Sequence, residues 1–527
     1  MEYFDKTPND RELSLFRSLT NSSCEVVKDC ILPDTYGDVK KILATSVKLS
    51  PDAECPEDGG VQYGGRLSVT ALFLTDDGEV ASMVIESDYE GHIPYAAGNG
   101  ILRTMSFPTA ENLQCRLINP RKIGIRTKIK PNLYLWEDAD TAVTYPDSVT
   151  DEDVLTFEEQ YVKVPYTLIE RFQSEGVESG DDIHVESPHP AIDTLLMKDI
   201  RFSSISCEAR EGAVAINATA EITLFYLADR ENAEKTLCIY RHSLPISTLL
   251  EAPSVKESHT VMAMLSWEDG NFAIEEDGQG ERRVCECDFT YRVSVLSASE
   301  AVGYCTKDLY SVRYDTTLGY GECRVAQNLS KTTVSTRAKM TMPLKEGFVP
   351  IAAQSIMKQY HIECGEEDRA VLCGTASAYL LLQNRESGIY TSETIEVPFK
   401  SVLSMPYSDQ NVYAAIPTLG ASEVKCEGTE ISLALSLSCT VTSFEIFGET
   451  VVVSATPIAE IPSDCGCSFT VYYPREEETL WDIAKKYRVR EEMLILADSE
   501  EFRRGKNRRA VLIPAKKTAA FHTVITP

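Results

Sequence analysis

Apolar and polar residues alternate with a period of two along most of this chain. Residues 214–224 are the clearest case, with Val, Ile, Ala, Ala, Ile and Leu at every second position. Polar turns such as Asp76-Asp77-Gly78 separate such runs. Period-two alternation is typical of antiparallel strands that bury one face. We therefore expect a mainly β protein.

One alternating pattern occurs three times. Each copy turns through charged or glycine-containing residues and ends on an apolar-Pro-apolar triplet. The triplet prolines, Pro94, Pro245 and Pro398, are 151 and 153 residues apart. Similar landmarks at one fixed period predict a repeated structural unit. The three copies are residues 64–95, 211–247 and 369–401.

Other landmarks flank each copy. A proline-led apolar segment precedes it, from Ile31, His189 or Val349, and a strand-like run follows it. Several strands per unit predict three antiparallel β-sandwich-like domains. We also expect short helices in the proline-led segments, at Asp38 to Leu43 and at Ile192 to Lys198. Residues 137–187 carry 15 Asp/Glu against two Lys/Arg, which predicts a solvated linker with one entering strand.

Charge and hydropathy exclude several classes of protein. A net charge of −30 argues against nucleic-acid binding, because phosphate contacts require a basic face. No stretch of 18 apolar residues is present, so we expect no membrane span. The first residues have neither a basic nor an apolar region of the signal-peptide type. The protein is therefore expected in the cytoplasm.

Catalytic and metal-binding patterns are absent from the sequence. The seven histidines are scattered, and no nucleophile elbow, phosphate loop or dinucleotide fingerprint occurs. Without an export signal, the 16 cysteines are expected to be reduced thiols rather than disulfides or metal ligands. We therefore expect no enzyme activity, no cofactor and no metal.

The C-terminal residues 469–514 predict a separate small module. Short strands at both ends enclose two short helices, and an Ile-Pro pair ends the segment. Thr479 and Asp482 have the spacing of a helix cap. Leu480, Ile483 and Ala484 form an inward stripe, and Trp481 lies off that stripe, where we expect it to be partly exposed.

This module resembles the LysM domain, through Thr479-Leu480-Trp481, Ile483-Ala484 and Leu512-Ile513-Pro514 among others. The resemblance implies a βααβ fold and binding to N-acetylglucosamine polymers such as peptidoglycan. The residues at the corresponding sugar-binding positions are Glu478, Thr479, Leu480 and Asp498. LysM domains usually have Gly-Asp-Thr where this chain has Glu477-Glu478-Thr479, and Asn where it has Asp498. The loss of the glycine and the added negative charge favour a protein ligand over a sugar.

The whole chain resembles the SPOCS-domain and LysM-domain family of clostridial spore-coat morphogenetic proteins. The family implies a nonenzymatic scaffold on the mother-cell side of the forespore surface that binds the coat's basement-layer ATPase or another coat protein. The alternative is a peptidoglycan-binding protein of the spore cortex or wall. The expected divisions are an N-terminal segment 1–22, SPOCS-like repeats 23–150, 151–310 and 311–463, and the LysM-like domain 464–527.

Partner contacts are expected on the LysM-like module. It has ten Lys/Arg against nine Asp/Glu over residues 469–514, so it is nearly neutral in an acidic chain. The basic run at 503–509 is open to three interpretations: a solvated loop, an electrostatic contact with an acidic protein, or docking onto the chain's own acidic repeats. The residues expected to bind the partner are Trp481, Lys485, Lys486, Arg503, Arg504 and Arg508.

Overall fold

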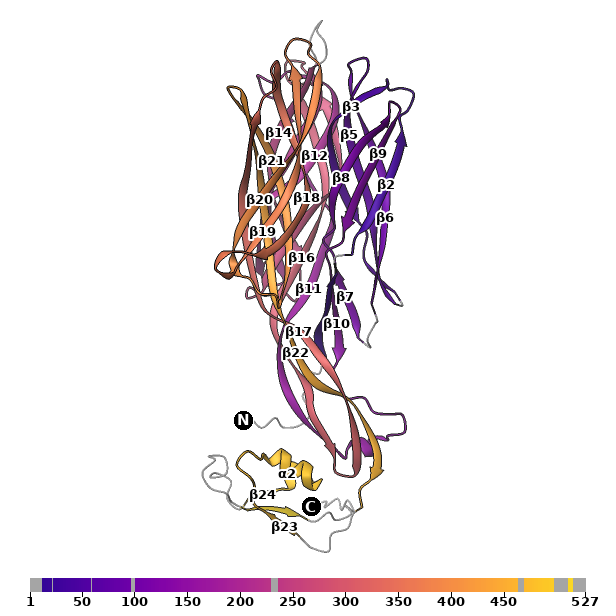
Figure 1. Cartoon of the computed structure of the whole chain (residues 1–527), viewed down its shortest axis with the longest axis vertical. Coiled ribbons are helices and arrows are strands. Elements are labelled where there is room, and N and C mark those ends of the chain that lie inside the picture. The colour runs from indigo at the N-terminus through magenta and orange to yellow at the C-terminus, as the bar shows by residue number, and fades with distance from the viewer. Residues whose placement is uncertain are drawn as a thin grey trace.

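The protein is mainly β and is built from antiparallel sheets, as the alternation predicts. The computed structural model describes residues 12–20, 22–57, 59–95, 100–228, 236–462, 469–496 and 510–514. The strands form three units that share one body, and a small C-terminal module lies beyond its lower end (Figure 1).

The described residues of unit 1 form ten strands in three sheets. Their orders are β3-β5-β6 with β4 added to β5, β2-β9-β8, and β1-β10-β7. The strands are β1 (Glu12–Thr20), β2 (Cys24–Ile31), β3 (Val39–Pro51), β4 (Cys55–Glu57), β5 (Gly60–Thr75), β6 (Val80–Pro94), β7 (Ile101–Met105), β8 (Thr109–Asn119), β9 (Lys122–Lys130) and β10 (Leu133–Asp140).

Outside the undescribed segment 229–235, unit 2 has six strands in two sheets, ordered β12-β13-β14 and β11-β16-β15. A core of buried side chains from both sheets lies within the unit. Its elements are α1 (Asp151–Val154), β11 (Phe157–His184), β12 (Ile192–Arg210), β13 (Ala213–Ala228), β14 (Thr236–Glu251), β15 (Thr260–Glu275) and β16 (Val284–Ser311).

Unit 3 repeats this strand order, as β18-β19-β20 and β17-β22-β21. Unit 1 follows the same order. In it, β1 and β2 take the place of the long strand β11 of unit 2, and β9 and β10 take the place of β16. The elements of unit 3 are β17 (Tyr314–Pro343), β18 (Phe348–Cys364), η1 (Glu366–Asp368), β19 (Arg369–Asn384), β20 (Tyr390–Pro406), β21 (Asn411–Glu427) and β22 (Glu430–Glu460).

The repeated prolines lie at equivalent places in this order. Pro94 pairs with Gly60, Pro245 with Thr219, and Pro398 with Thr375. In each case the proline is on the third strand of the three, at the edge of its sheet. An edge strand tolerates proline because one side of the strand needs no ladder hydrogen bond.

The predicted short helices were wrong. Strand β3 begins at Val39 and pairs with β5, and strand β12 begins at Ile192 and pairs with β13. Each of these strands has two register shifts near its start, at Val39/Lys41 and Ile42/Ala44 in β3. An extra residue at a bulge breaks the period of two and leaves apolar residues three or four apart, which resembles helical spacing.

Most of the predicted linker at 137–187 is also a strand. Strand β11 pairs with β16 from Phe157 to His184, and β10 extends to Asp140. Many acidic residues of β11 lie on its solvent side, as at Glu178, so the charge reflects an exposed strand face.

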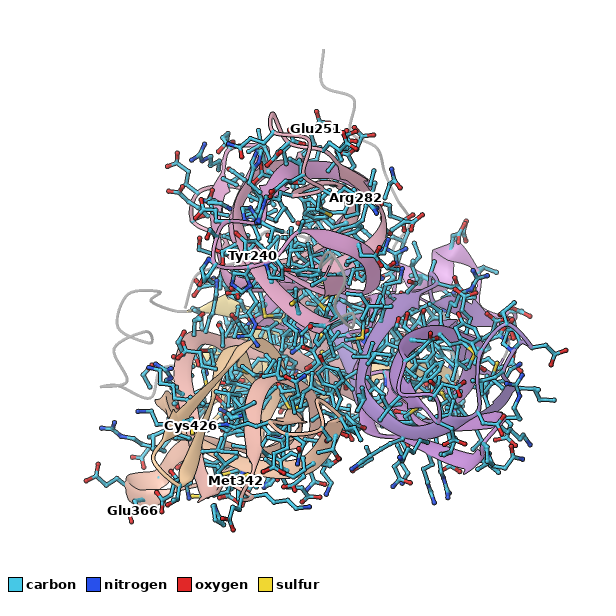
Figure 2. The ribbon with its side chains drawn as sticks, turned by 90° about the horizontal axis from the view of Figure 1, so that it is seen from above. Tyr240, Glu251, Arg282, Met342, Glu366 and Cys426 are labelled. Atoms are coloured by element: carbon cyan, nitrogen blue, oxygen red, sulfur yellow. The ribbon has the colours of Figure 1, made fainter. Side chains whose placement is uncertain are left out.

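The three units pack around a common centre, which is clear from above (Figure 2). One core cluster contains Leu72 of unit 1, Phe225 of unit 2 and Leu381 of unit 3, each at most 1% exposed. A second cluster joins Trp136, Met262 and other residues from all three units. The units therefore share apolar cores and are not three separately packed domains.

Strands β11, β16, β17 and β22 are 28 to 31 residues long. Their ends near residues 157, 311, 314 and 460 extend below the main body toward the C-terminal module (Figure 1). We call this extension the stalk. It positions Asp308 and Tyr310, near the end of β16, against the module.

Candidate functional site

Among its described residues, the C-terminal module has one α-helix and a small sheet of order β23-β25-β24. Helix α2 begins after Thr479, whose hydroxyl accepts a hydrogen bond from the amide of Asp482 while the Asp482 carboxylate accepts one from the Thr479 amide. The predicted capping box is thus confirmed. The elements are β23 (Phe469–Tyr472), α2 (Leu480–Tyr487), η2 (Glu491–Met493), β24 (Ile495–Leu496) and β25 (Val511–Pro514).

Helix α2 packs on one face of this sheet. Ile483 is fully buried together with Val511 and Ile513 of β25, and Leu480 packs against the same cluster. Leu480, one of the predicted sugar-binding residues, therefore contributes to the core. The helix ends at Arg488, which adopts a left-handed conformation with φ of 55°.

The opposite side of α2 docks onto the stalk. Trp481 is only 8% exposed, and its ring meets that of Tyr310 edge-on at a centroid distance of 4.9 Å. The Tyr310 hydroxyl donates to the Val489 carbonyl at 2.7 Å. The expectation that Trp481 is partly exposed was wrong, because it considered the module alone and the covering surface belongs to β16.

Asp308 is the polar centre of this contact. Its carboxylate accepts a hydrogen bond from Trp481 Nε1 at 2.9 Å and from Lys485 Nζ at 2.6 and 2.7 Å. Burial acts to raise the pKa of Asp308, but the hydrogen bonds from Lys485 and Trp481 outweigh it and hold the pKa below its usual value. Trp481 and Lys485, both predicted to bind a partner, are thus brought together on the chain's own stalk.

Arginines extend the docking contact on either side. Arg488 lies 3.2 Å from the Asp315 carboxylate. Arg490 lies 3.4 Å from Glu158 and donates to the Leu155 carbonyl at 2.9 Å. These pairs are partly exposed, so each adds orientation more than stability.

The remaining described site residues lie away from the stalk. Lys486 Nζ donates to the Tyr472 hydroxyl at 3.0 Å and lies 4.5 Å from the centre of that ring. Glu478 accepts from the Tyr472 hydroxyl at 2.8 Å and from the Arg475 amide at 3.0 Å. The amide and hydroxyl bonds lower the pKa of Glu478. Arg503, Arg504, Arg508 and Asp498 lie outside the described residues.

The sheet of the module exposes an apolar outer face that the sequence analysis missed. Phe469, Val471 and Tyr473 alternate along β23 and beyond, and they are 59%, 45% and 67% exposed. Val471 and Ile495 both pair with Leu512 of β25, so they lie in one row across the sheet, and Ile495 is 60% exposed. We call these four residues and Leu512 the outer face. The Phe-x-Val-x-Tyr alternation was its signal in the sequence.

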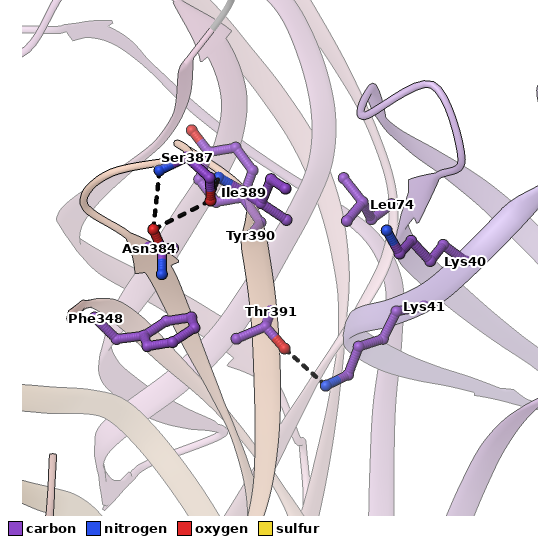
Figure 3. Close-up of a pocket in the computed structure, with 9 residues that line it drawn as sticks. All are labelled: Lys40, Lys41, Leu74, Phe348, Asn384, Ser387, Ile389, Tyr390 and Thr391. Carbon is purple, nitrogen blue, oxygen red and sulfur yellow. Dashed lines mark hydrogen bonds between the residues drawn. The ribbon is translucent and has the colours of Figure 1, made fainter. Parts of the chain in front are cut away.

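A pocket of about 440 Å³ lies between units 1 and 3 (Figure 3). Lys41 Nζ donates to the Thr391 hydroxyl at 2.8 Å across its mouth, which ties the two units together. The buried side chains of Leu74 and Tyr390 also line it. Within the described residues, no cluster of three or more His, Cys, Asp or Glu has the geometry to hold a metal ion.

Comparisons of the chain with protein-family models, with curated proteins and with solved structures found no match. Among the described residues, no helix combines the length and the apolar character that a membrane crossing requires.

Proposed function

We propose that this protein is a nonenzymatic scaffold of spore-coat assembly, with three SPOCS-like β-sandwich repeats and a LysM-like module. In this proposal the protein works on the mother-cell side of the forespore surface. The module binds the coat's basement-layer ATPase, or another coat protein, through the outer face. The sequence resemblance supports the family, and the geometry of the module supports the mode of contact.

The outer face is the observation that carries the proposal. Four large apolar side chains, between 45% and 67% exposed, lie on the small sheet or directly after its strand β23, and Val471 and Ile495 share one row. Contiguous exposed apolar surface in a soluble domain commonly marks a protein-binding site. The other side of the module is already occupied by the stalk through Trp481 and Lys485. The body would therefore present the outer face in a fixed direction.

Peptidoglycan binding remains the alternative function. Against it, Glu478 is held within the module by Tyr472 and Arg475. In the sequence, Asp498 in the place of the usual Asn also offers a sugar fewer hydrogen-bond donors than an amide would.

The two functions can be separated in sporulating clostridial cells. A fluorescent fusion should collect at the forespore surface, and deletion of the gene should leave spores whose coat is misplaced in thin-section electron micrographs. The purified protein should stay in the supernatant when peptidoglycan is sedimented. Uniform fluorescence, a normal coat and sedimentation with peptidoglycan would refute the scaffold proposal.

A further inference from the structure

The sheet β2-β9-β8 of unit 1 turns a basic face to solvent. Its central strand buries Ile123, Ile125 and Ile129, so the alternate residues point outward. The outward residues of β9 pair with β2 as Lys122 with Ile31, Arg126 with Val27 and Lys128 with Glu25. We call this the basic face, made of Lys122, Arg126, Lys128, Arg116, Val27, Ile31 and Ile118.

Cationic and apolar side chains are combined on this face. Residues 112–136 contain six Lys/Arg and no Asp/Glu, in a chain with a net charge of −30. Val27, Ile31 and Ile118 are 63%, 73% and 51% exposed. Three acidic residues neutralise part of the charge: Glu25 lies 2.8 Å from Arg126, Asp29 lies 2.7 Å from Lys122, and Glu111 of β8 pairs with Lys128 in the strand register. The four cations of the face outnumber these three carboxylates, so the face stays cationic.

The equivalent sheet of unit 2, β11-β16-β15, has the opposite charge. In the ladder between β11 and β16, Asp182 pairs with Glu286 and Gly180 pairs with Asp288. Repulsion from Glu275 and Asp288 raises the pKa of Glu286, which shows that these carboxylates crowd one another. We call this the acidic face, made of Glu178, Asp182, Glu275, Glu286 and Asp288.

The third equivalent sheet, β17-β22-β21 of unit 3, is neutral at its centre. Its central strand has no Asp or Glu between Glu430 and Glu445; Ser436, Ser438 and Thr440 lie on its solvent side, and Thr333 pairs with Thr440. All three sheets have one strand order, so folding alone does not demand charge at these positions. The difference between the faces therefore points to a role outside the fold.

We propose that the basic face of one molecule docks on the acidic face of unit 2 in a second copy of this chain. The charges are complementary, and the contact would relieve the crowding at Glu286. Gly180 and Ala273 are small residues within the acidic face, opposite Asp288 and Glu286, so the exposed apolar side chains of the basic face meet little bulk there.

The two faces belong to different units, which lie around a common centre (Figure 2). One molecule can therefore use both faces at once, each with a different neighbour. Such a head-to-tail contact joins two different surfaces and does not close on itself unless its rotation forms a ring. The expected product is an open chain of molecules, independent of the outer face on the C-terminal module.

Sedimentation velocity of the full chain tests this proposal. Wild-type protein should show a sedimentation coefficient that rises with concentration at low salt and not at high salt. The change Arg126→Glu with Lys128→Glu makes both faces acidic and should abolish the rise. Glu286→Lys with Asp288→Lys makes both faces basic and should also abolish it.

Mixing these two variants should restore association, because the acidified face of one meets the basic face created on the other. A chain that carries all four changes should also associate.

Arg337→Glu with Lys339→Glu, an equal charge change on unit 3, is the matched control and should leave association intact. Should the first variant fail to fold by circular dichroism, Arg116→Gln with Lys128→Gln replaces it. A monomeric wild type at low salt, persistent association in either variant, or failure of the mixture to associate would overturn the proposal.

Discussion

The indole nitrogen of Trp481 donates a hydrogen bond to Asp308, 2.9 Å away and 173 residues earlier in the chain. The same carboxylate accepts two bonds from Lys485. One aspartate at the end of the stalk thus anchors the C-terminal module, and Tyr310 supplies the apolar contact beside it. The orientation of the outer face depends on this small set of contacts.

Replacement of Asp308 should release the module. Asp308→Ala leaves Trp481 Nε1 and Lys485 without their acceptor, and hydrogen bonds to charged groups contribute about 1.5–3 kcal/mol. We expect faster proteolysis between β22 and β23 and a larger radius of gyration in small-angle X-ray scattering. Asp88→Ala is the control, because Asp88 forms an exposed pair 3.6 Å from Arg66 whose loss should have little effect. Equal proteolysis of both variants would contradict a docking role for Asp308.

Acid should undock the module in the same way. The pKa of Asp308 is lowered in the docked state, so docking is fully stabilised above the usual aspartate pKa of about 4 and is lost as the pH falls through the lowered value. Trp481 should then become exposed, and its fluorescence should shift to the red below about pH 4. The variant Trp481→Phe keeps only Trp136 and Trp267, so the difference between its fluorescence and that of the wild type reports on Trp481. An unchanged transition in Asp308→Asn would contradict the assignment to Asp308.

Alternation of apolar residues predicted the strand content, because a strand buries every second residue whichever strand it pairs with. It did not predict the starts of β3 and β12, where bulges alter the spacing. Trp481 is expected to be partly exposed from the sequence because helical spacing describes one helix and not the surface that docks on it. The covering residue Tyr310 is distant in sequence, and no local pattern links the two.

The outer face was missed for a related reason. Apolar residues at every second position of a short strand predict a buried face. In the structure, Val511 and Ile513 supply the core of the module, and Val471 faces outward. The alternation gives the two faces of a strand but not which of them is covered.

The shared cores predict that the three units unfold together. Phe225 is 1% exposed in a cluster that includes residues of units 1 and 3. Phe225→Ala should cost about 3–5 kcal/mol and should lower the temperature of a single calorimetric transition. Ile246, which is 8% exposed in the core of unit 2, provides a comparison as Ile246→Val. Separate transitions, with only one of them shifted, would contradict a common centre.

Reductant should have little effect on stability. The 14 cysteines in the described part of the chain form no disulfide; among them, the sulfur atoms of Cys305 and Cys323 lie 3.6 Å apart. The melting temperature should therefore be unchanged when dithiothreitol is added to freshly purified protein. A native disulfide would contribute about 2–5 kcal/mol, and a fall of several degrees would show that one had been overlooked.

Direct titration of the purified coat ATPase with the full-length protein is the closest test of the proposed function. Val471→Lys with Ile495→Lys places two charges on the outer face, and we expect it to weaken binding by about 2 kcal/mol or more. Glu477→Lys is the control, since Glu477 is exposed on the same module but lies outside that face. We expect the control to bind like wild type. Equal affinity of the outer-face variant and wild type, with both folded, would contradict the account.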